Sequence, residues 1–393
     1  MRILHTSDWH LGRSLHRENL LPAQRAFLDH LVRTVEEERV DAVLVAGDVY
    51  DRAVPSLGAV ELFDEVLHKL AALAVPVVLI SGNHDSAQRL GIGAGLIARA
   101  GVHLRTDPDA VAEPVLLADE HGEVAVYGLP YLEPSLVRAR VGADQVSHVA
   151  VLGAAMDAVR ADLAERRAAS EGGALRSVVL AHAFVVGGEA SDSERDIAVG
   201  GVPSVPAAVF DGVDYAALGH LHGCQTIAER VRYSGSPLAY SFSEADHRKS
   251  MWLVALGPAG ELTAARIDCP VPRRLVRLRG ELAELLSSPA YDTAEDCWVQ
   301  ATLTDAARPV QAMEQLRRRF PHTLQLSFEP EGREEDSLAS YGERVRGRDD
   351  GAVALGFVRH VRGAAASTAE SALLVAAVEA AALTAASAAG GEG

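Results

Sequence analysis

Side chains that can bind metal ions recur in this sequence directly after predicted strands. Seven of them share this position: Asp8, His10, Asp48, Asn83, His182, His220 and His222. Ligands of open α/β sheets gather at the carboxyl ends of strands, so we expect these side chains to converge on one edge. Oxygen and nitrogen donors without a thiolate suit Mn²⁺, Fe²⁺ or Zn²⁺ better than Ca²⁺. Seven ligands exceed the needs of one ion. They fit two ions roughly 3.5–4 Å apart around a bridging carboxylate, an arrangement used to displace a group at phosphorus.

The spacing within two of these motifs supports a shared site. In Asp8-x-His10 and His220-x-His222, alternate residues of an extended segment would point the same way, so each pair is expected to clamp one site. Glycines in the same stretches would let the backbone turn tightly beneath the ions: Gly47, Gly82 and Gly219.

Each motif alone also has an ordinary structural interpretation. A single D-x-H occurs by chance, Gly-Asp after a strand is a common turn, and an isolated His182 would more often be a hydrogen-bonded core residue. The joint occurrence of the motifs, in order and each at a predicted strand end, favours the metal site.

Apolar segments and amphipathic segments alternate up to about residue 270, which predicts an α/β architecture with helix-covered sheets. The expected strands are Arg2–His5, Ala42–Ala46, Val77–Ile80, Val124–Gly128, Ser177–Leu180 and Tyr215–Leu218. The expected helices are Pro22–Glu38, Leu57–Leu73 and His148–Arg167. A later pair, Arg232–Gly235 and Ser250–Leu256, is expected to form strands at the edge of a second sheet.

The last third of the chain has a different organisation. Cys269–Pro272 is typical of a linker, the residues after it predict a compact βαβαβ unit, and the charged stretch at residues 330–337 indicates a second boundary. Alanine-rich helices are expected over Asp350–Val361 and Thr368–Leu383. We therefore predict domains at residues 1–270, 271–335 and 336–393.

Composition restricts the class of protein. The chain is 48% hydrophobic and 23% charged, which is ordinary for a soluble globular protein. The polar N-terminus argues against a signal peptide, and three cysteines without a CxxC pair suggest reduced thiols, so we expect a cytoplasmic protein. The net charge of −17 argues against a general polyanion-binding surface. Bound metal ions would supply positive charge where a nucleic acid docks.

The motifs D-x-H, GD, GNHD, H and GHxH, in this order, resemble those of the calcineurin-like metallophosphoesterases. The segments MRILHTSDWHLGRSLHRENL, VDAVLVAGDVYDRAVPS, LISGNHDS and YSGSPLAYSFSEADHRKS are similar to the SbcD-like nuclease subunits within that family. The likeness covers nearly the whole chain and is weakest in the tail. It implies a four-layer sandwich of two mixed sheets flanked by helices, a small α+β capping domain and C-terminal helices.

The resemblance also implies roles for the site residues. One ion would be held by Asp8, His10, Asp48 and His222, and the other by Asp48, Asn83, His182 and His220, with Asp48 as the bridge. His84 would face the substrate phosphate as the catalytic acid–base residue without binding metal. Asn83 is a neutral ligand, so the ion pair would keep net positive charge, and Asp85 is expected to orient the loop or His84.

The activity that the resemblance implies is DNA cleavage by a two-metal phosphodiesterase. It would be a 3′→5′ exonuclease on duplex DNA and an endonuclease on single strands or hairpins, in double-strand end processing, repair, recombination and replication. Mn²⁺ is the expected metal, with Fe²⁺ or Zn²⁺ as alternatives. The expected location is the nucleoid-associated cytoplasm, with no membrane.

The implied partners are DNA and an SMC-like ATPase subunit, SbcC, in a two-plus-two heterotetramer. No GxxxxGK[ST] motif occurs in the chain, so ATP dependence would have to come from that partner. A homodimer would form through Pro55–Leu73 and Leu90–Ala100, and the tail helices would dock on the partner's coiled coil. The same segments could equally pack within the chain.

Basic residues are candidate phosphate contacts. The first group is Arg13, His16 and Arg17, and the others are Arg273, Arg274, Arg277 and Arg279, and Arg317–Arg319. Solvated surface charge is an equal alternative for each group.

Two other functions are open to the same sequence. One is a stand-alone metallophosphoesterase acting on small nucleotides or phosphoproteins, and the other is a scaffold that binds DNA ends without cutting. The capping domain and tail argue against the first, and the complete set of ligands argues against the second.

Overall fold

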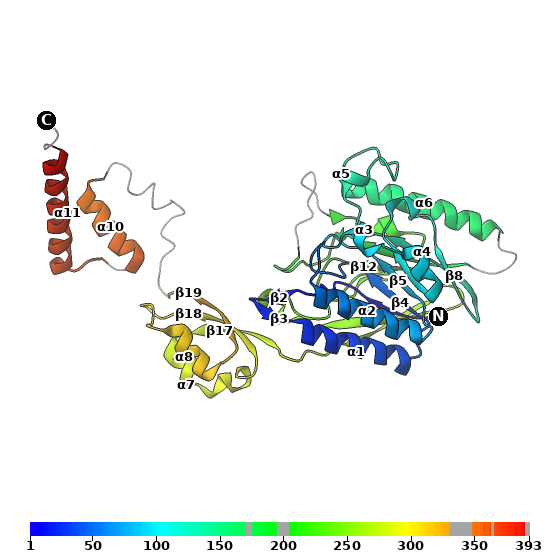
Figure 1. Ribbon diagram of the computed structural model, residues 1–393, viewed down its shortest axis with the longest axis horizontal. Coiled ribbons are helices and arrows are strands. Elements are labelled where there is room, and N and C mark those ends of the chain that lie inside the picture. The colour runs from blue at the N-terminus through cyan, green and yellow to red at the C-terminus, as the bar shows by residue number, and fades with distance from the viewer. Residues whose placement is uncertain (170–174, 195–203, 331–347, 363–364, 390–393) are drawn as a thin grey trace. The chain divides into compact units, whose positions relative to one another are not determined.

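The computed structural model of the protein describes residues 1–169, 175–194, 204–330, 348–362 and 365–389 (Figure 1). The chain divides into two compact units, Met1–Val276 and Arg277–Gly393, called here the first and the second unit. The boundary predicted at residues 330–337 lies largely outside the described residues. Among the described helices, none combines the length and the hydropathy that a membrane crossing requires.

The first unit contains two six-stranded mixed sheets. The first sheet has the strand order β16-β15-β1-β4-β5-β6. Its strands are β1 (Arg2–Thr6), β4 (Ala42–Ala46), β5 (Val77–Ile80), β6 (Val102–Arg105), β15 (Ser250–Leu256) and β16 (Leu262–Asp268). The first four run parallel to one another, and β15 pairs antiparallel with both β1 and β16. Parallel strands of this kind, apolar on both faces, belong in the interior of a layered fold.

The second sheet has the order β13-β14-β12-β9-β8-β7. Its strands are β7 (Val115–Asp119), β8 (Gly122–Leu129), β9 (Arg176–His182), β12 (Tyr215–Gly219), β13 (Gln225–Ala228) and β14 (Val231–Tyr233). The four central strands are parallel, so the carboxyl ends of β9 and β12 lie together.

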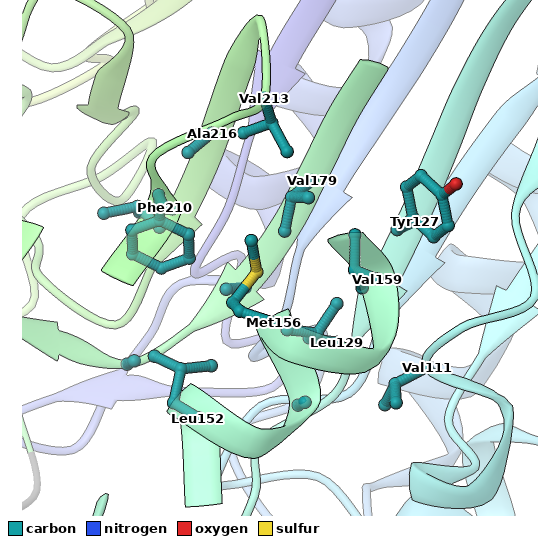
Figure 2. Packing of buried hydrophobic residues seen from close by; sticks show 14 of the residues in the cluster. Val111, Tyr127, Leu129, Leu152, Met156, Val159, Val179, Phe210, Val213 and Ala216 are labelled. Atoms are coloured by element: carbon teal, nitrogen blue, oxygen red, sulfur yellow. The ribbon is translucent and has the colours of Figure 1, made fainter. Parts of the chain in front are cut away.

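Helices cover the outer face of each sheet. Helices α1 (Leu21–Glu37) and α2 (Leu57–Ala72) share one apolar cluster with the outward side chains of β1, β4 and β5. Helix α6 (His148–Ala169) packs on the second sheet, where Met156 and Val159 lie against side chains of β8 and β9 (Figure 2). A third cluster lies between the sheets and joins residues such as Leu44 and Val178. The four layers confirm the predicted metallophosphoesterase sandwich.

One predicted grouping of strands is wrong. Residues 232–235 and 250–256 were expected to lie together at a sheet edge, but β14 belongs to the second sheet and β15 lies inside the first sheet, between β16 and β1. Strand β15 is buried on both faces because Met251 joins the helix-covered cluster and Val254 joins the cluster between the sheets. Closeness in sequence does not decide which sheet a strand enters.

Short elements connect the main ones. In the first unit these are β2 (Ser14–Leu15), β3 (Glu18–Asn19), α3 (Ala87–Leu90), α4 (Ala94–Ile97), η1 (Ala98–Ala100), η2 (Pro108–Ala110), α5 (Pro134–Val137), β10 (Phe184–Val185), β11 (Ser204–Val205), η3 (Ala207–Phe210) and η4 (Phe242–Glu244).

The second unit contains the predicted βαβαβ elements. They are β17 (Leu275–Gly280), α7 (Leu282–Ser287), β18 (Trp298–Leu303), α8 (Ala312–Arg319) and β19 (Thr323–Phe328), with η5 (Pro289–Ala294) before β18. The three strands form one sheet, and Leu285 and Leu316 of the helices are fully buried. Two tail helices follow, α10 (Asp350–Arg362) and α11 (Thr368–Ala389), which pack against each other.

The two sheets approach closely at the carboxyl ends of β4 and β12. A Cβ atom on Gly219 would lie 1.9 Å from the carbonyl oxygen of Ala46, and a Cβ on Gly82 would lie 2.1 Å from the Asp48 carboxylate. Gly219 therefore requires glycine because the backbone of the facing sheet blocks a side chain, and Gly82 requires it because the Asp48 carboxylate and amide of its own sheet do.

We expect Gly219→Ala to lower the free energy of unfolding by about 1–3 kcal/mol, a typical cost of overpacking, because the blocking atom belongs to the backbone and no rotamer change relieves the clash. Urea denaturation followed by near-UV circular dichroism measures the change. Gly153→Ala on α6 is the matched control, since its Cβ would meet nothing within 4 Å. That variant should gain about 0.5–1 kcal/mol. Equal denaturation midpoints for the two variants would contradict the close approach.

Candidate metal centre

The carboxyl ends of strands from both sheets supply the predicted ligands. Asp8 and His10 follow β1, Asp48 follows β4 and Asn83 follows β5 in the first sheet. The second sheet supplies three histidines: His182 ends β9, and His220 and His222 follow β12. Six of the seven side chains are buried, and Asn83 is half-buried. The structure thus brings all seven together, at the meeting of two sheets rather than along the edge of one.

Asp8, His10 and His222 form the first group of potential ligands. Their donor atoms lie within 4.8 Å of one another. The Nε2 atoms of His10 and His222 are 3.0 Å apart. Serine and backbone groups hold Asp8 in place, with Ser7 Oγ donating at 2.5 Å and the His220 amide at 3.0 Å.

Asp48 lies between that first group and a second one. Its Oδ2 is 3.7 Å from His10 Nε2 and 3.5 Å from His182 Nε2. His182 Nε2 is also 2.9 Å from Asn83 Oδ1, and His220 Nδ1 is 3.3 Å from the same oxygen. The Asp48 carboxylate is therefore near histidines of both groups, and Asp8 also lies within 4.8 Å of Asp48 and His182.

Four of the ligand residues have positive φ angles, which non-glycine residues adopt at a cost of about 1–3 kcal/mol. The values are 53° at Asp8, 44° at His10, 50° at Asp48 and 109° at His220. The expectation that Asp8-x-His10 and His220-x-His222 are extended is therefore wrong. Because the backbone turns at His220, the two histidines separate: His222 contacts His10, while His220 contacts Asn83. Of the two predicted pairs, only Asp8 and His10 have both members in the same group of ligands.

Hydrogen bonds between the loops stabilise this strained backbone. The amide of Asp8 donates to the Gly47 carbonyl at 3.0 Å, and the amide of His10 donates to the Asp48 carbonyl at 2.9 Å. The Asp85 carboxylate accepts from the amides of Val49, Tyr50 and Gly82 at 2.9–3.1 Å. The predicted loop-orienting role of Asp85 is thus confirmed.

His84 lies at the border of the centre. Its amide donates to Asp48 Oδ1 at 2.8 Å, and its Nδ1 donates to the Asp51 carbonyl at 2.8 Å, because a carbonyl can only accept. The neutral ring then has its lone pair on Nε2, 4.0 Å from Asp48 Oδ2. His10, Asp48 and His84 are also close enough to hold an ion. The geometry therefore permits either a ligand or a substrate-facing role for His84.

Burial and mutual charge shift the pKa values of the buried groups in opposite directions. Burial raises the pKa of Asp8 to about 6. Burial also opposes ionisation of Asp48, but the neighbouring imidazoles, His182 first, hold its pKa well below the usual range. Burial disfavours the charged form of His182, yet the Asp48 carboxylate raises its pKa to about 9. Burial lowers the pKa of His220 to about 3.

These residues fit a divalent metal ion. His182 Nδ1 donates to the Ala46 carbonyl at 2.9 Å, so its Nε2 would offer a lone pair to the centre once a cation displaces the Nε2 proton. His10 and His222 direct Nε2 atoms at each other, an arrangement that a cation between the lone pairs would stabilise. His10 Nδ1 is buried and has no hydrogen-bond partner among the described residues. Buried carboxylates and imidazoles without a thiolate are donors for Mn²⁺, Fe²⁺ or Zn²⁺.

Residues behind the predicted ligands were missed by sequence reasoning. Glu244 and Lys249 form a buried ion pair next to His222. Gln24 donates to the His10 carbonyl at 2.8 Å, and the Tyr240 ring lies 5.3 Å from the His10 ring. Glu244, Lys249 and Tyr240 fall in the segment YSGSPLAYSFSEADHRKS, which resembles the family but contains none of its ligand motifs.

The structure separates the three predicted DNA-contacting residues near the N-terminus. The Arg13 guanidinium lies beside the centre, where Nη2 donates to the Ser193 carbonyl at 2.8 Å and the group stacks on Tyr240. Arg13 Nη1 is buried without a partner among the described residues. His16 and Arg17 are exposed in the turn between β2 and β3.

Three solved structures are similar to this chain. TT1561 of Thermus thermophilus has 14% identity, a TM-score of 0.38, and coverage of 67% of this chain and 98% of that one. GAP50, the anchor in the inner membrane complex of Plasmodium, has 10% identity, a TM-score of 0.41, and coverage of 84% and 98%. A dimetal phosphatase from Danio rerio has 13% identity, a TM-score of 0.39, and coverage of 69% and 99%.

Family models match both parts of the chain. The calcineurin-like phosphoesterase model matches residues 1–224, which include all seven predicted ligands. The SbcD_C model, described as the type 5 capsule protein repressor C-terminal domain, matches residues 271–361. This domain order agrees with the SbcD-like nuclease subunits that the sequence resembles. The chain belongs to the calcineurin-like phosphoesterase family of metal-dependent hydrolases, with an SbcD-type C-terminal domain.

Proposed function

We propose that this protein is the nuclease subunit of an SbcCD-type complex and hydrolyses DNA phosphodiester bonds at double-strand ends. The observation that carries this proposal is a complete set of seven metal donors, six of them buried, in a chain whose C-terminal region matches the SbcD_C model. The proposed activities are 3′→5′ exonuclease on duplex DNA and endonuclease on single strands and hairpins, in repair, recombination and replication.

The proposed centre holds two Mn²⁺ ions, with Fe²⁺ or Zn²⁺ as alternatives. Asp8, His10 and His222 would bind one ion; Asn83, His182 and His220 would bind the other. Asp48 would serve both, because its carboxylate contacts His10 and His182. Bound ions lower the pKa of a coordinated water and offset charge that develops on the phosphate.

The protein's own residues would orient the phosphate and assist the leaving oxygen. His84 Nδ1 is anchored on the Asp51 carbonyl, which leaves Nε2 toward the centre to exchange a proton or accept a hydrogen bond. Arg13 has a buried Nη1 with no partner among the described residues, beside the same centre and suited to a phosphate oxygen. His16 and Arg17 would contact the DNA backbone farther out.

Basic residues of the second unit are partly engaged within it. Arg319 pairs with Asp292 and Glu295, and Arg317 donates to the Thr323 carbonyl at 3.1 Å. Arg318 is exposed and lines a shallow depression with Gln315. We therefore favour Arg318 over its two neighbours as a DNA contact.

We propose SbcC, an SMC-like ATPase, as the partner and the tail helices as its dock. Helices α10 and α11 pack against each other yet leave large apolar side chains exposed, including Phe357 and Leu373. The cytoplasmic, nucleoid-associated location follows from the same proposal.

The proposed homodimer would use exposed apolar residues on and beside α2 and α4 of the first unit. Leu57 at the start of α2 is 74% exposed, and Leu96 on α4 is 73% exposed; Val54 and Ile92 are also exposed.

We expect Leu96→Glu to convert a dimer to a monomer in light scattering coupled to size-exclusion chromatography, because a buried charge would oppose association. Leu116→Glu on β7 is the control and should remain dimeric. A wild-type monomer, or a dimeric Leu96→Glu variant, would argue against this interface.

A nuclease assay tests the proposed function. We expect Mn²⁺-loaded protein to release nucleotides from the 3′ ends of a linear duplex, faster when the ATPase subunit and ATP are present. Asp48→Ala should be inactive and should retain neither ion in elemental analysis, because it removes the shared carboxylate. Cleavage of bis-p-nitrophenyl phosphate but not of DNA would favour a stand-alone phosphoesterase. Binding of DNA ends with neither substrate cleaved would favour a scaffold.

His84→Ala tests the proposed acid–base role. We expect the variant to keep both Mn²⁺ ions and DNA binding while turnover falls about 10²–10⁴-fold, the usual worth of a positioned proton donor. His121→Ala, at an exposed histidine, should leave turnover unchanged. Loss of an ion from the His84 variant would instead place His84 among the ligands.

A further inference from the structure

Glu244 is a fully buried carboxylate directly behind His222. It ends the short helix η4 and is 1% exposed. Its Oε1 lies 3.1 Å from His222 Nδ1, the ring nitrogen on the side away from His10. The Ser193 hydroxyl lies between them, 2.6 Å from His222 Nδ1 and hydrogen-bonded to the same Oε1.

These contacts determine which His222 nitrogen is protonated. A carboxylate can only accept hydrogen bonds, so the Ser193 hydroxyl donates to Glu244 and its oxygen accepts from His222. The Nδ1 of His222 is therefore the donor, both in a hydrogen bond to Ser193 and in one to Glu244. The proton of the neutral ring is therefore on Nδ1, and the lone pair of Nε2 points toward Asp8 and His10.

Lys249 keeps Glu244 in position. The Lys249 ammonium contacts Glu244 Oε2 and also donates to Ser236 Oγ at 2.9 Å and to the His222 carbonyl at 3.0 Å. Its three N–H groups thus each have an acceptor. One of these acceptors is the backbone of His222, so the ion pair fixes both the ring and the main chain of this residue.

A buried ion pair contributes little stability compared with apolar residues of the same volume, so stability alone is a weak reason for its presence. An acceptor on the remote nitrogen of a metal-binding histidine, by contrast, sets the tautomer and orientation of the ring. Within the described residues, Glu244 and Ser193 make such contacts with His222.

We propose that Glu244 is a positioning residue for metal binding: through the Nδ1 proton of His222 it aims the Nε2 lone pair into the Asp8–His10–His222 group. This inference rests on the metal centre of the proposed function and adds residues outside the family's ligand motifs. It predicts that losing the carboxylate weakens one of the two ion sites selectively.

Glu244→Gln is the direct test. Glutamine keeps the shape, but when its oxygen faces Lys249 its amide N–H₂ faces His222 and favours a proton on the wrong nitrogen. We expect one of two Mn²⁺ ions to bind about 10–100-fold more weakly in isothermal titration of metal-stripped protein. The second ion should bind as in the wild type. Low-temperature electron paramagnetic resonance at one equivalent of Mn²⁺ per site should change from a spin-coupled pair to isolated ions.

Two further variants separate positioning from stability. Glu244→Leu combined with Lys249→Met removes both charges, a change that buried ion pairs often tolerate, and should show the same selective loss of Mn²⁺. Asp119→Asn breaks another ion pair, between the half-buried Asp119 and the buried Arg176 at the amino end of β9, away from the centre. It should lower the melting temperature and leave Mn²⁺ binding unchanged.

The outcomes distinguish this inference from the proposed function. If the wild type binds two coupled Mn²⁺ ions and both Glu244 variants do the same with equal affinity, Glu244 has no positioning role. Equal weakening of both sites in the double variant would also overturn the selectivity that we propose. A wild type that binds no pair of ions would instead overturn the two-metal centre itself.

Discussion

The close contact of two sheets at their carboxyl ends is the constraint on which the rest of the structure depends. His182 of β9 donates to the Ala46 carbonyl of β4, and a Cβ on Gly219 would collide with the same oxygen. Nearby, His5 of β1 bonds the Tyr215 hydroxyl and the Leu218 carbonyl. Because the two backbones are held this close, ligands that follow strands of the two sheets lie within hydrogen-bond distance of one another.

This contact concentrates charge in a place where water cannot screen it. Asp8 and Asp48 are both buried, yet burial raises the pKa of Asp8 while imidazoles hold that of Asp48 low. Carboxylates and imidazoles buried without a counterion are costly, and their mutual hydrogen bonds offset that cost only in part. A divalent cation would compensate these groups at once. It would also provide local positive charge for a polyanion in a chain of net charge −17.

The strands and the candidate ligands could be predicted from the sequence because both depend on short-range patterns. Apolar runs such as Val77–Ile80 define buried strands. Packing alone does not explain the polar residues Asn83 and His84 directly after such a strand. The left-handed turns at Asp8 and His220 were not predictable, since they depend on hydrogen bonds to residues that are distant in sequence. For the same reason the sheet entered by β15 and the position of Glu244 behind His222 became visible only in three dimensions.

All seven predicted ligands, His84 and Glu244 lie in the first unit, and the second unit supplies none of them. The hydrolytic chemistry therefore needs only the family's shared fold, in which the ligands sit on loops that two rigid sheets hold in place. In the function proposed here, the second unit would select substrate and partner without supplying any residue of the strained centre. This division explains why a general phosphoesterase model matches the first part of the chain while a more specific C-terminal model matches the second. It also explains why the chemistry can be argued from individual residues, whereas the proposal that DNA is the substrate rests on the match of residues 271–361 to the SbcD_C model.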